Sequence, residues 1–310
     1  MVGTGEPLLV AIDSGQTAIK ISAGDGPPLA LPGLRANASL LPQLADAVGQ
    51  AASQVTGPLQ VAVGTCGLTR PDNDPERLLR LCEPYGVTRV LLAHDSVTSF
   101  LGALGDRRGV TVAAGTGVII LGVGEREVAR VDGWGNVIGD TGGGHWIGRE
   151  ALEAVLRAHD GRGPATLLTD VVRHRFPDLD RVPTQLQADP DYVRVVASFA
   201  RDTDRLADTD PVAGSICDRA GEELAFSAAT AVDRIGEADR TNPLICLIGG
   251  VSAGARVRAA CVAALRRRWP AFVPFPAQGD GLAGARALPS VPAGHPLSHR
   301  IAVAAVPAGR

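Results

Sequence analysis

Apolar and polar residues alternate in short, regular stretches along the first half of the chain. Apolar runs at residues 8–12 and 18–22 flank a polar segment at 13–17, which predicts two strands joined by a tight turn. From Leu41 to Val55 the apolar residues recur with the spacing of an amphipathic helix, and Gly57 should end it. The chain therefore begins with a predicted β-hairpin followed by a helix.

Strands and helices continue to alternate along the rest of the chain. Strands are predicted at 59–63 and 90–93 with a short helix near 76–81, and this alternation favours a largely parallel central sheet. The order of strand, Gly/Thr turn and strand returns at 110–121, which indicates an internal duplication. The elements predicted after it are helices at 149–157, 166–182, 192–202 and 212–234, a strand at 244–248 and a helix at 255–268.

The repeated pattern predicts an α/β fold with two lobes. We expect an N-terminal α/β lobe at residues 1–108 and a C-terminal α/β lobe at 109–310, with a helical insertion at about 160–240 in the second. The tail after Pro289 is rich in proline and shows no periodicity, so no element is predicted there.

Composition bounds the class of protein and its partners. The chain has 310 residues, of which 45% are hydrophobic and 20% charged, and its formal net charge is -3. This composition is globular, and it lacks the positive field that would hold nucleic acid or an anionic membrane. No apolar stretch reaches the roughly 20 residues of a membrane-spanning helix. Small molecules are therefore the expected partners.

The cysteines and the N-terminus favour a cytoplasmic protein. No cysteine belongs to a CxxC pair, so we expect reduced and mostly buried thiols. The N-terminal segment has no basic region before its apolar stretch, unlike a signal peptide. The cysteines are Cys66, Cys82, Cys217, Cys246 and Cys261.

Lys20 is the single lysine of the chain, and its position excludes two nucleotide-binding motifs. A Walker A loop needs Gly-Lys-Ser/Thr, but Ile19 precedes Lys20. The lysine and the His-Arg-Asp loop of protein kinases are also missing. A nucleotide would therefore be bound without a P-loop.

Two glycine-containing turns could bind phosphate. Asp13, Gly15, Gln16 and Thr17 combine a carboxylate for Mg²⁺ with backbone amides for phosphate oxygens, although Asp and Gly are equally typical of an ordinary hairpin turn. The turn Gly115-Thr116-Gly117 offers a similar cradle at the matching place of the second half. Two such turns in a duplicated unit favour opposing contacts to one phosphate chain.

A glycine-rich segment at residues 133–150 surrounds Asp140. Packing alone does not require so many glycines, because their conformational entropy opposes folding. Asp140 is therefore the best candidate for a substrate-binding carboxylate in this segment. Trp134 and Trp146 could line a ligand site or fill the core.

Asp95 follows a predicted strand and begins a predicted helix. A carboxylate at the carboxyl end of a strand lies at the usual ligand edge of an α/β sheet, where it could act as a general base. The same residue could instead cap the helix, and one side chain could do both. His94 has no partner pattern that suggests direct chemistry.

A serine hydrolase is a competing interpretation. Residues 250–254 match Gly-x-Ser-x-Gly between a strand and a helix, with Ser252 at the nucleophile position. Asp280 and His295 follow in the order of an α/β-hydrolase triad. The late position of the motif and the lack of a His-Gly-Gly-Gly segment count against this hypothesis.

Taken together, these segments resemble the sugar kinases of the actin, hexokinase and heat-shock chaperone ATPase superfamily. Within it, the chain is similar to the BadF/BadG/BcrA/BcrD ATPase family, which includes N-acetylglucosamine kinase. The matching segments are 13–17 (first phosphate motif), 115–117 (second), 247–252 (adenosine motif), 281–285 (a small-residue helix) and, most specifically, the Gly-Trp-Gly, Gly-Asp and Trp-Ile-Gly block at 133–150. Ser14, Gln16, Val118 and Thr141 depart from the usual residues of the family, and the last two put the identity of the substrate in doubt.

The resemblance implies a two-lobed ribonuclease H-like (actin/hexokinase-type) ATPase fold with an interlobe cleft. Asp95 would be the catalytic base, and Asp13 would hold Mg²⁺ through water. The sugar would be bound by Asn37, Asp95, Gly117 and Asp140, the phosphates by the two turns, and the adenosine by Gly249, Gly250, Val251 and Ser252.

The expected activity is ATP-dependent phosphorylation of an amino sugar, most specifically of N-acetylglucosamine to its 6-phosphate. Glucosamine, N-acetylmuramic acid and glucose are alternative substrates, and a non-catalytic sugar sensor is an alternative function. ATP and Mg²⁺ are the expected cofactors. The resemblance also implies a homodimer.

Overall fold

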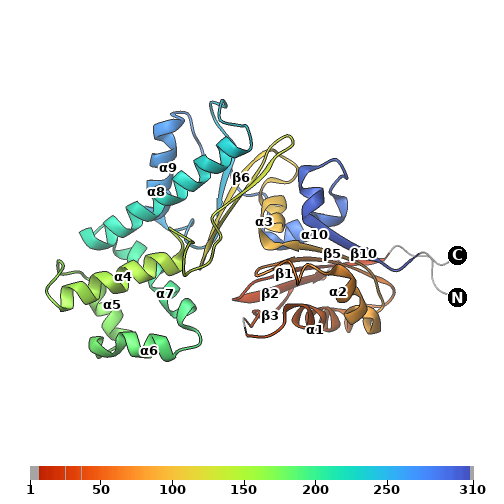
Figure 1. The fold of residues 1–310 in the computed structure, drawn as a ribbon, viewed down its shortest axis with the longest axis horizontal. Coiled ribbons are helices and arrows are strands. Elements are labelled where there is room, and N and C mark those ends of the chain that lie inside the picture. Colours follow the sequence, from red (N-terminus) through yellow and green to blue (C-terminus); the bar gives the residue numbers. More distant parts are fainter. Residues whose placement is uncertain (1–6, 25, 36, 308–310) are drawn as a thin grey trace. The chain divides into compact units, whose positions relative to one another are not determined.

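The computed structural model describes residues 7–307 apart from 25 and 36, and the chain forms two compact units. Unit 1 contains the described residues through Arg107 and those from Ala277 onward, whereas unit 2 runs from Arg108 to Pro276. Each unit contains one mixed β-sheet covered by helices (Figure 1). Each is described by itself below.

Unit 1 is built on a six-stranded sheet with the order β10-β5-β4-β1-β2-β3. β1 pairs in parallel with β4, and β4 pairs in parallel with β5, whereas the other neighbours are antiparallel. Helices α1 and α2 cover one face, and α3 and α10 the other (Figure 1). The elements are β1 (Leu8–Ser14), β2 (Ala18–Ala23), β3 (Leu29–Pro32), α1 (Leu40–Ala52), β4 (Leu59–Thr65), α2 (Pro75–Cys82), β5 (Val87–His94), α3 (Asp95–Leu104), α10 (Gly281–Ala287) and β10 (Ile301–Ala305), with 3-10 turns at Glu83–Tyr85, Leu288–Ser290 and Pro296–Arg300.

Successive residues of β1 point to opposite faces of this sheet. Val10 and Ile12 of β1 point into the core beneath α1, whereas Ala11 packs against Leu282 of α10. Asp13 lies two residues after Ala11, and since side chains alternate along a strand it lies on the α10 face. The strand pattern therefore directs one carboxylate toward the face that α3 and α10 cover.

Unit 2 contains a four-stranded sheet with the order β8-β7-β6-β9. β6, β7 and β8 form an antiparallel meander, and β9 pairs in parallel with β6. The same strand order, β3-β2-β1-β4, occurs in unit 1. The elements are β6 (Gly109–Ala114), β7 (Val118–Val123), β8 (Val128–Val131), α4 (Gly144–His159), α5 (Leu168–Arg175), α6 (Val182–Ala188), α7 (Tyr192–Leu206), α8 (Pro211–Arg234), β9 (Ile245–Ile248) and α9 (Ala255–Arg268), with a 3-10 turn at Leu179–Arg181.

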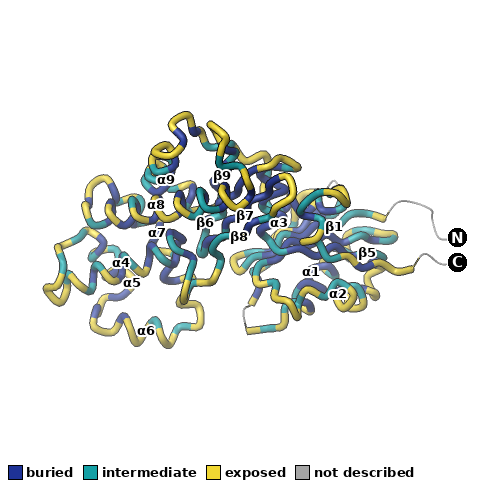
Figure 2. Tube along the Cα trace, turned by 45° about the horizontal axis from the view of Figure 1, so that its top comes forward, coloured by how far each residue is buried: buried dark blue, intermediate teal, exposed yellow. Residues whose placement is uncertain are grey.

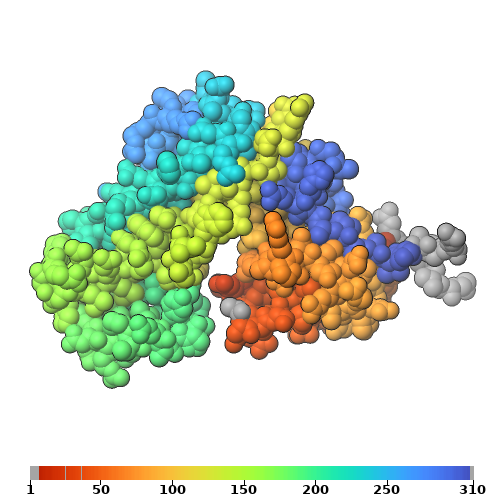
Figure 3. Space-filling model, in the orientation of Figure 1, coloured from red at the N-terminus to blue at the C-terminus, as the bar shows by residue number. Residues whose placement is uncertain are grey.

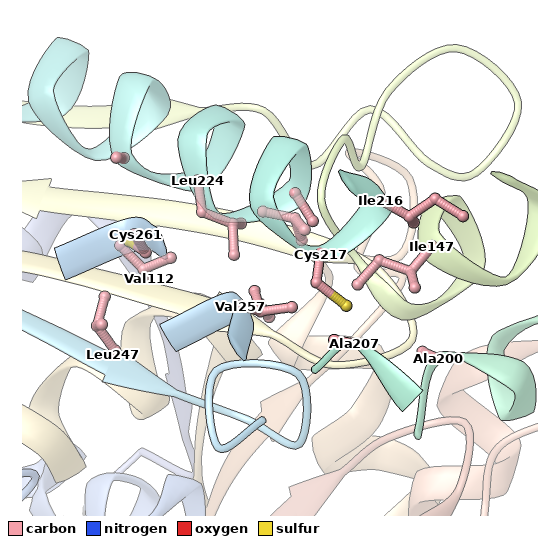
Figure 4. Close-up of a cluster of buried hydrophobic side chains, with 14 of the residues drawn as sticks. Val112, Ile147, Ala200, Ala207, Ile216, Cys217, Leu224, Leu247, Val257 and Cys261 are labelled. Carbon is pink, nitrogen blue, oxygen red and sulfur yellow. The ribbon is translucent and has the colours of Figure 1, made fainter. Parts of the chain in front are cut away.

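The core of unit 2 lies between its sheet and helices α4, α7, α8 and α9. Figure 4 shows Cys217 and Leu224 of α8 facing Val257 and Cys261 of α9, and all four are buried. The first turn of α9 has no side-chain cap of its own, and the carboxylate of Asp204 on α7 accepts its first three amide hydrogens at 2.9–3.2 Å. The negative carboxylate also interacts favourably with the partial positive charge at the N-terminal end of the helix. Asp204 therefore fixes the position of α9 relative to α7.

The C-terminal segment returns to unit 1, which corrects the expected domain division. The sequence assigned everything from 109 to 310 to one lobe, but residues from Ala277 onward belong to unit 1. β10 pairs antiparallel with β5, and α10 packs on α3, where Gly284 leaves no room for a side chain against the carbonyl of Thr98. In Figure 3 these C-terminal residues, in dark blue, lie against the orange side chains of unit 1. This pairing joins residues far apart in sequence, which local patterns do not report.

Other elements confirm or correct the sequence predictions. The hairpin of β1 and β2 is confirmed, and α1 buries the predicted apolar face. The expected largely parallel sheet is wrong, because both sheets combine parallel and antiparallel pairs. The helix predicted at 166–182 ends at Arg175, and a new helix begins at Val182. The five cysteines are free, and all except Cys66 are buried.

Burial follows this architecture along the chain. In Figure 2 the central strands β4, β5, β6 and β7 are mostly dark blue, whereas β3, β10 and α6 are largely intermediate or exposed. Within the described residues, no helix combines the length and apolarity needed to cross a bilayer.

Candidate active site

Three parallel strands of unit 1 bring Asp13 and Asp95 to the same edge of the sheet. In the register of β1, β4 and β5, Asp13 lies beside Gly64, and Gly64 lies beside Ala93. Asp95 follows two residues after Ala93 and begins α3. Because parallel strands end at one edge, the two carboxylates from distant parts of the sequence face the same region.

Asp13 is held in a confined, largely buried place. The backbone of Gly281 lies so close to its carboxylate that a β-carbon there would approach both oxygens at 2.7 Å. Burial raises the pKa of Asp13 from 3.8 to about 6, Lys20 opposes this shift, and the charges of Asp95 and Asp280 add to it. Among the described residues, none donates a hydrogen bond to this carboxylate. Asp13 is therefore a carboxylate that a cation would stabilise.

Lys20 supplies the positive charge of this cluster. It lies directly opposite Asp13 in the antiparallel register of β1 and β2. Its Nζ also pairs with Oδ2 of Asp280 at 3.1 Å. Burial raises the pKa of Asp280, but the amide of Ala283 and Lys20 outweigh it, so the net shift is downward. The single lysine of the chain thus joins two of the carboxylates.

Asp95 has one oxygen that is buried without a hydrogen-bond donor. Nδ1 of His94 lies 2.8 Å from this Oδ1, but the same nitrogen accepts the amide hydrogen of Ser96 at 3.1 Å. In the tautomer that accepts this bond, Nδ1 carries no proton for Asp95. His94, rather than Asp95, therefore provides the side-chain cap of α3, which corrects the capping interpretation of Asp95. A hydroxyl group of a ligand could supply the donor that Oδ1 lacks.

The carboxylate cluster of unit 1 suits Mg²⁺ better than a fully protein-ligated metal. No group of three or more His, Cys, Asp or Glu side chains that could hold an ion occurs among the described residues. Mg²⁺ usually keeps several waters and binds through one or two carboxylates and substrate phosphates. Asp13, buried and without a hydrogen-bond donor in the described chain, fits that role.

The turn after β1 is tight and packed on its neighbours. The amide of Gly15 donates to the carbonyl of Ala18 at 3.0 Å, and the backbone of Gln16 packs against Gly33. The side chains of Gln16 and Thr17 are exposed, as is that of Asn37. The structure thus places Asn37 in unit 1 with the turn and Asp95, but it supplies no contact that tests its predicted role.

The turn after β6 is closed by its own backbone and by the start of α4. Gly115 donates to the carbonyl of Gly117 at 2.9 Å, and the amides of Gly144 and His145 donate to the carbonyls of Gly115 and Thr116 at 2.8 and 2.9 Å. No described residue accepts a hydrogen bond from the amides of Thr116 and Gly117. These two amides are the ones that could bind an anion.

Asp140 lies beside this turn in a left-handed backbone conformation, with φ of 58°. Only 9% of the residue is exposed, and its carboxylate accepts the amide of Gly135 at 3.2 Å. Burial raises its pKa, although the amides of Gly135 and Val118 oppose the shift. A β-carbon on Gly117 would collide with this carboxylate. The glycine is therefore needed for the close approach of Asp140 to the turn.

A second carboxylate, Asp132, holds the segment in this shape. Its two oxygens accept the amides of Asp140 and Thr141 at 2.9 and 3.1 Å. Trp134 is 71% exposed and lies under the guanidinium of Arg130, so it is not a core residue. Trp146 is partly buried against the core of unit 2.

The segment Gly249–Ser252 forms a tight turn between β9 and α9. Gly249 has φ of 93°, and a β-carbon there would collide with the carbonyl of Ala114. The amide of Val251 donates to the same carbonyl at 3.0 Å. Nothing lies within 4 Å of a β-carbon placed on Gly250. The exposed backbone of Gly250 is thus accessible to a ligand, as the adenosine hypothesis requires.

The hydrolase arrangement finds no support in the structure. Ser252 is 3% exposed, and its Oγ is buried without a hydrogen-bond partner, so no base activates it. Asp280 pairs with Lys20 and caps α10, and Nδ1 of His295 accepts the amide of Leu297. Both residues serve local structure in unit 1, whereas Ser252 belongs to unit 2.

Sequence reasoning missed three residues that shape the candidate site. Lys20 pairs with Asp13 across the hairpin, and the signal for this pairing is that both residues are equally far from the centre of the turn. Asp280 stands out in the sequence only as a hydrolase candidate. Asp132 precedes a Gly-Trp-Gly segment, but nothing local indicates that its carboxylate binds amides eight and nine residues later.

Two curated relatives match parts of the chain. An N-acetylmuramic acid/N-acetylglucosamine kinase of Clostridium acetobutylicum is 34% identical over 111 residues, which cover 35% of this chain and 36% of the relative. An N-acetyl-D-glucosamine kinase of Dictyostelium discoideum is 36% identical over 125 residues, 38% of this chain and 39% of the relative. The matched segments thus span little more than a third of either relative.

Solved structures resemble the whole chain. A proposed N-acetylglucosamine kinase from Chromobacterium violaceum is 25% identical, with a TM-score of 0.66 over 90% of this chain and 97% of its own. A ROK hexokinase from Thermus thermophilus is 18% identical, with a TM-score of 0.55 over 90% and 96%. These likenesses confirm the actin/hexokinase-type ATPase fold.

A family model covers the central part of the chain. The model of the BadF/BadG/BcrA/BcrD ATPase family matches residues 80–288, which is more than half of the chain and includes Asp95, Asp140 and the turn at 115–117. The predicted family is confirmed: this chain belongs to the BadF/BadG/BcrA/BcrD ATPase family.

Proposed function

We propose that this protein is an ATP-dependent sugar kinase that phosphorylates an amino sugar, with N-acetylglucosamine and its 6-phosphate as the first choice. One observation carries the proposal: with Nδ1 of His94 accepting the Ser96 amide, Oδ1 of Asp95 is buried without a hydrogen-bond donor, at the sheet edge it shares with Asp13. A buried acceptor without a donor costs free energy unless a ligand completes it. A sugar hydroxyl would supply that donor.

Asp95 would act as the general base. In the proposed complex its Oδ1 accepts the proton of the primary hydroxyl as the oxygen attacks the γ-phosphorus, and the bond to the leaving ADP oxygen breaks. General bases of this kind contribute roughly 10²–10⁴-fold to a rate. The cap that His94 provides to α3 would keep Asp95 free of that structural task.

Asp13, through Mg²⁺, and Lys20 would balance the negative charge of the phosphates. Asp13 would hold Mg²⁺ through water, and when bound the ion neutralises charge on the phosphate oxygens. Lys20 lies opposite Asp13 and keeps positive charge beside the same edge. Gln16 and Thr17 would present backbone amides to the phosphates, whereas the amide of Gly15 donates to Ala18 and gives the turn its shape.

Unit 2 would contribute the other substrate contacts. Asp140 would accept hydrogen bonds from sugar hydroxyls, and the amides of Thr116 and Gly117 would bind phosphate. The accessible backbone of Gly250 supports an adenosine site at Gly249–Ser252.

The amino-sugar choice rests on the names of relatives. Both curated relatives are named as kinases of N-acetylglucosamine, and one also of N-acetylmuramic acid. Glucosamine and glucose stay as alternatives because Thr141 and Val118 depart from the family pattern beside Asp140. A homodimer and a cytoplasmic location, where ATP is available, are part of the same proposal.

The experiment is ADP release by the purified protein with Mg²⁺-ATP and each of the four sugars in turn, with a reaction lacking sugar as control. The proposal predicts release that depends on sugar and is fastest with N-acetylglucosamine. Release with another sugar alone would change the substrate and keep the reaction. Sugar binding in calorimetry without ADP release would instead show a sensor and contradict the kinase.

A further inference from the structure

A cavity of about 330 Å³ lies among the helices of unit 2, and its lining includes none of the residues assigned to catalysis or substrate binding. One face of α4 forms one wall, α6 forms another, and Val196 of α7 contributes a third. The wall is mostly apolar, and the cavity is open to solvent. Its apolar residues are Leu152, Leu156, Val182, Pro183, Leu186 and Val196.

His145 is the polar residue of this cavity that lacks a side-chain partner. Only 7% of the residue is exposed, it lines the cavity, and no described residue forms a hydrogen bond with its ring. Its ring and that of Tyr192 form a T-shaped pair, with the two ring centroids 6.2 Å apart. Burial, helped by Arg149, lowers the pKa of His145, so the neutral ring offers one donor and one acceptor.

The charged residues at the cavity already have opposite charges beside them. Arg149 pairs with Glu150 at 2.9 Å, and Arg162 forms two hydrogen bonds with Asp160 at 2.7 and 2.8 Å. Glu153 lies 3.5 Å from Arg157. A charged ligand would have to compete with these pairs, whereas a neutral ligand would not. The wall therefore favours an uncharged molecule with one hydrogen-bonding group.

His145 links the cavity to the two segments that shape the candidate active site within unit 2. The backbone amide of His145 donates to the carbonyl of Thr116 in the turn after β6. The hydroxyl of Tyr192 accepts a hydrogen bond from Asn136, in the segment between Asp132 and Asp140, at 3.3 Å. A ligand bound against His145 would therefore contact a residue that holds the turn at 115–117 and that packs on Tyr192, the partner of Asn136.

We propose that this cavity is an effector site for a small uncharged alcohol with an apolar body, whose hydroxyl binds the ring of His145. The site does not depend on the proposed kinase activity, because the cavity and its lining belong to the helical part of unit 2. An occupant would restrict the motion of the turn at 115–117 through the His145 backbone.

Benzyl alcohol is the probe, with toluene as the analogue that lacks the hydroxyl. Binding of both to the full chain is measured by ligand-observed NMR titration for the wild type, His145→Leu, Leu186→Trp and His174→Leu. Leu186 is half-buried on the exposed helix α6, so Leu186→Trp fills the cavity with little risk to folding. His174 is exposed and makes the matched histidine control.

The ratio of the toluene dissociation constant to that of benzyl alcohol should fall about fivefold in His145→Leu, the effect of one hydrogen bond. Leu186→Trp should weaken both ligands, and His174→Leu should match the wild type. Benzyl alcohol should slow amide hydrogen exchange at residues 115–118 in the wild type. No binding, an unchanged ratio in His145→Leu, or unchanged exchange at 115–118 would each overturn the proposal.

Discussion

The two turns proposed to bind phosphate obtain their charge in different ways. In unit 1 the charges beside the turn after β1 belong to the flanking strands, where Asp13 of β1 and Lys20 of β2 are direct cross-strand partners. In unit 2 the turn after β6 has no charged residue, and Asp140 reaches it from a separate segment in a left-handed conformation. A repeated strand order thus carries two unlike sites.

This difference separates the tasks that each turn can perform. The charges of unit 1 surround Asp13 and Asp95, which suits a cation and proton transfer. The backbone geometry of unit 2 fixes one carboxylate against Gly117, which suits recognition of hydroxyl groups. Substitutions of the charged residues of unit 1 should therefore affect turnover, and those that displace Asp140 in unit 2 should affect substrate affinity.

The largest effect is expected for Asp95→Asn. If Asp95 is the general base, kcat should fall by roughly 10²–10⁴-fold, while the dissociation constants for sugar and ATP stay close to those of the wild type. Steady-state ADP release and calorimetry measure the two quantities. Asp46→Asn, an exposed carboxylate on α1, is the control and should leave kcat unchanged. A similar kcat in both variants would remove Asp95 from the chemistry.

Asp140→Asn should act on the sugar instead. Asparagine tolerates the left-handed conformation, so the backbone is kept while the negative charge is lost. Hydrogen bonds to a charged group contribute about 1.5–3 kcal/mol, so the sugar KM should rise roughly 10–100-fold. The KM for ATP should change little. A selective loss of ATP affinity would place Asp140 on the nucleotide.

The two turns can also be compared by one alanine substitution in each. Gly117→Ala would push the Asp140 carboxylate aside, and a displacement of this kind should lower kcat/KM for the sugar by at least about tenfold. A β-carbon on Gly15 would meet nothing closer than the carbonyl of Ala18 at 3.7 Å, so Gly15→Ala should retain activity within about threefold. Equal losses in both variants would contradict the assigned geometry.

The smallest effect concerns stability and its dependence on pH. The folded-state pKa of Asp13, about 6, lies above its ordinary value of 3.8, so the folded protein binds the proton more tightly than the unfolded chain. The resulting destabilisation is absent below pH 3.8 and complete above about pH 6. Asp13→Asn should therefore raise the free energy of unfolding at pH 7.5 by roughly 1–3 kcal/mol.

Urea denaturation of wild type and Asp13→Asn at pH 7.5 and at the lowest pH at which both fold measures this difference. The gain in stability should shrink as the pH falls toward 4, and the variant should lose activity at every pH. A gain that does not depend on pH would mean that Asp13 is not the buried ionised group described above.

Local sequence patterns predicted those helices and strands whose own residues alternate between a buried and an exposed face. The β1–β2 hairpin and α1 follow directly from alternating or helical spacing. The strands β3 and β8 have four residues each, too short for a clear alternation. The predicted helix at 166–182 is divided because Asp178 caps a 3-10 turn and Pro183 starts a new helix.

Long-range pairing limited both the domain and the site predictions. β10 becomes a strand because β5 offers it an edge, which no nearby residue signals. Asp13, Asp95 and Asp140 could be selected from residue type and position at strand ends or among glycines. Lys20, Asp280 and Asp132 set the charge and the conformation around these carboxylates. Their contacts could be identified only from the strand register and the backbone of the folded chain.

The most direct test of the central claim is ³¹P NMR of the products that form from Mg²⁺-ATP and N-acetylglucosamine. The account predicts a sugar 6-phosphate monoester that accumulates in equal amount to ADP, and neither product in the absence of sugar. Inorganic phosphate in equal amount to ADP, with no sugar phosphate for any of the four sugars, would contradict phosphoryl transfer to a sugar.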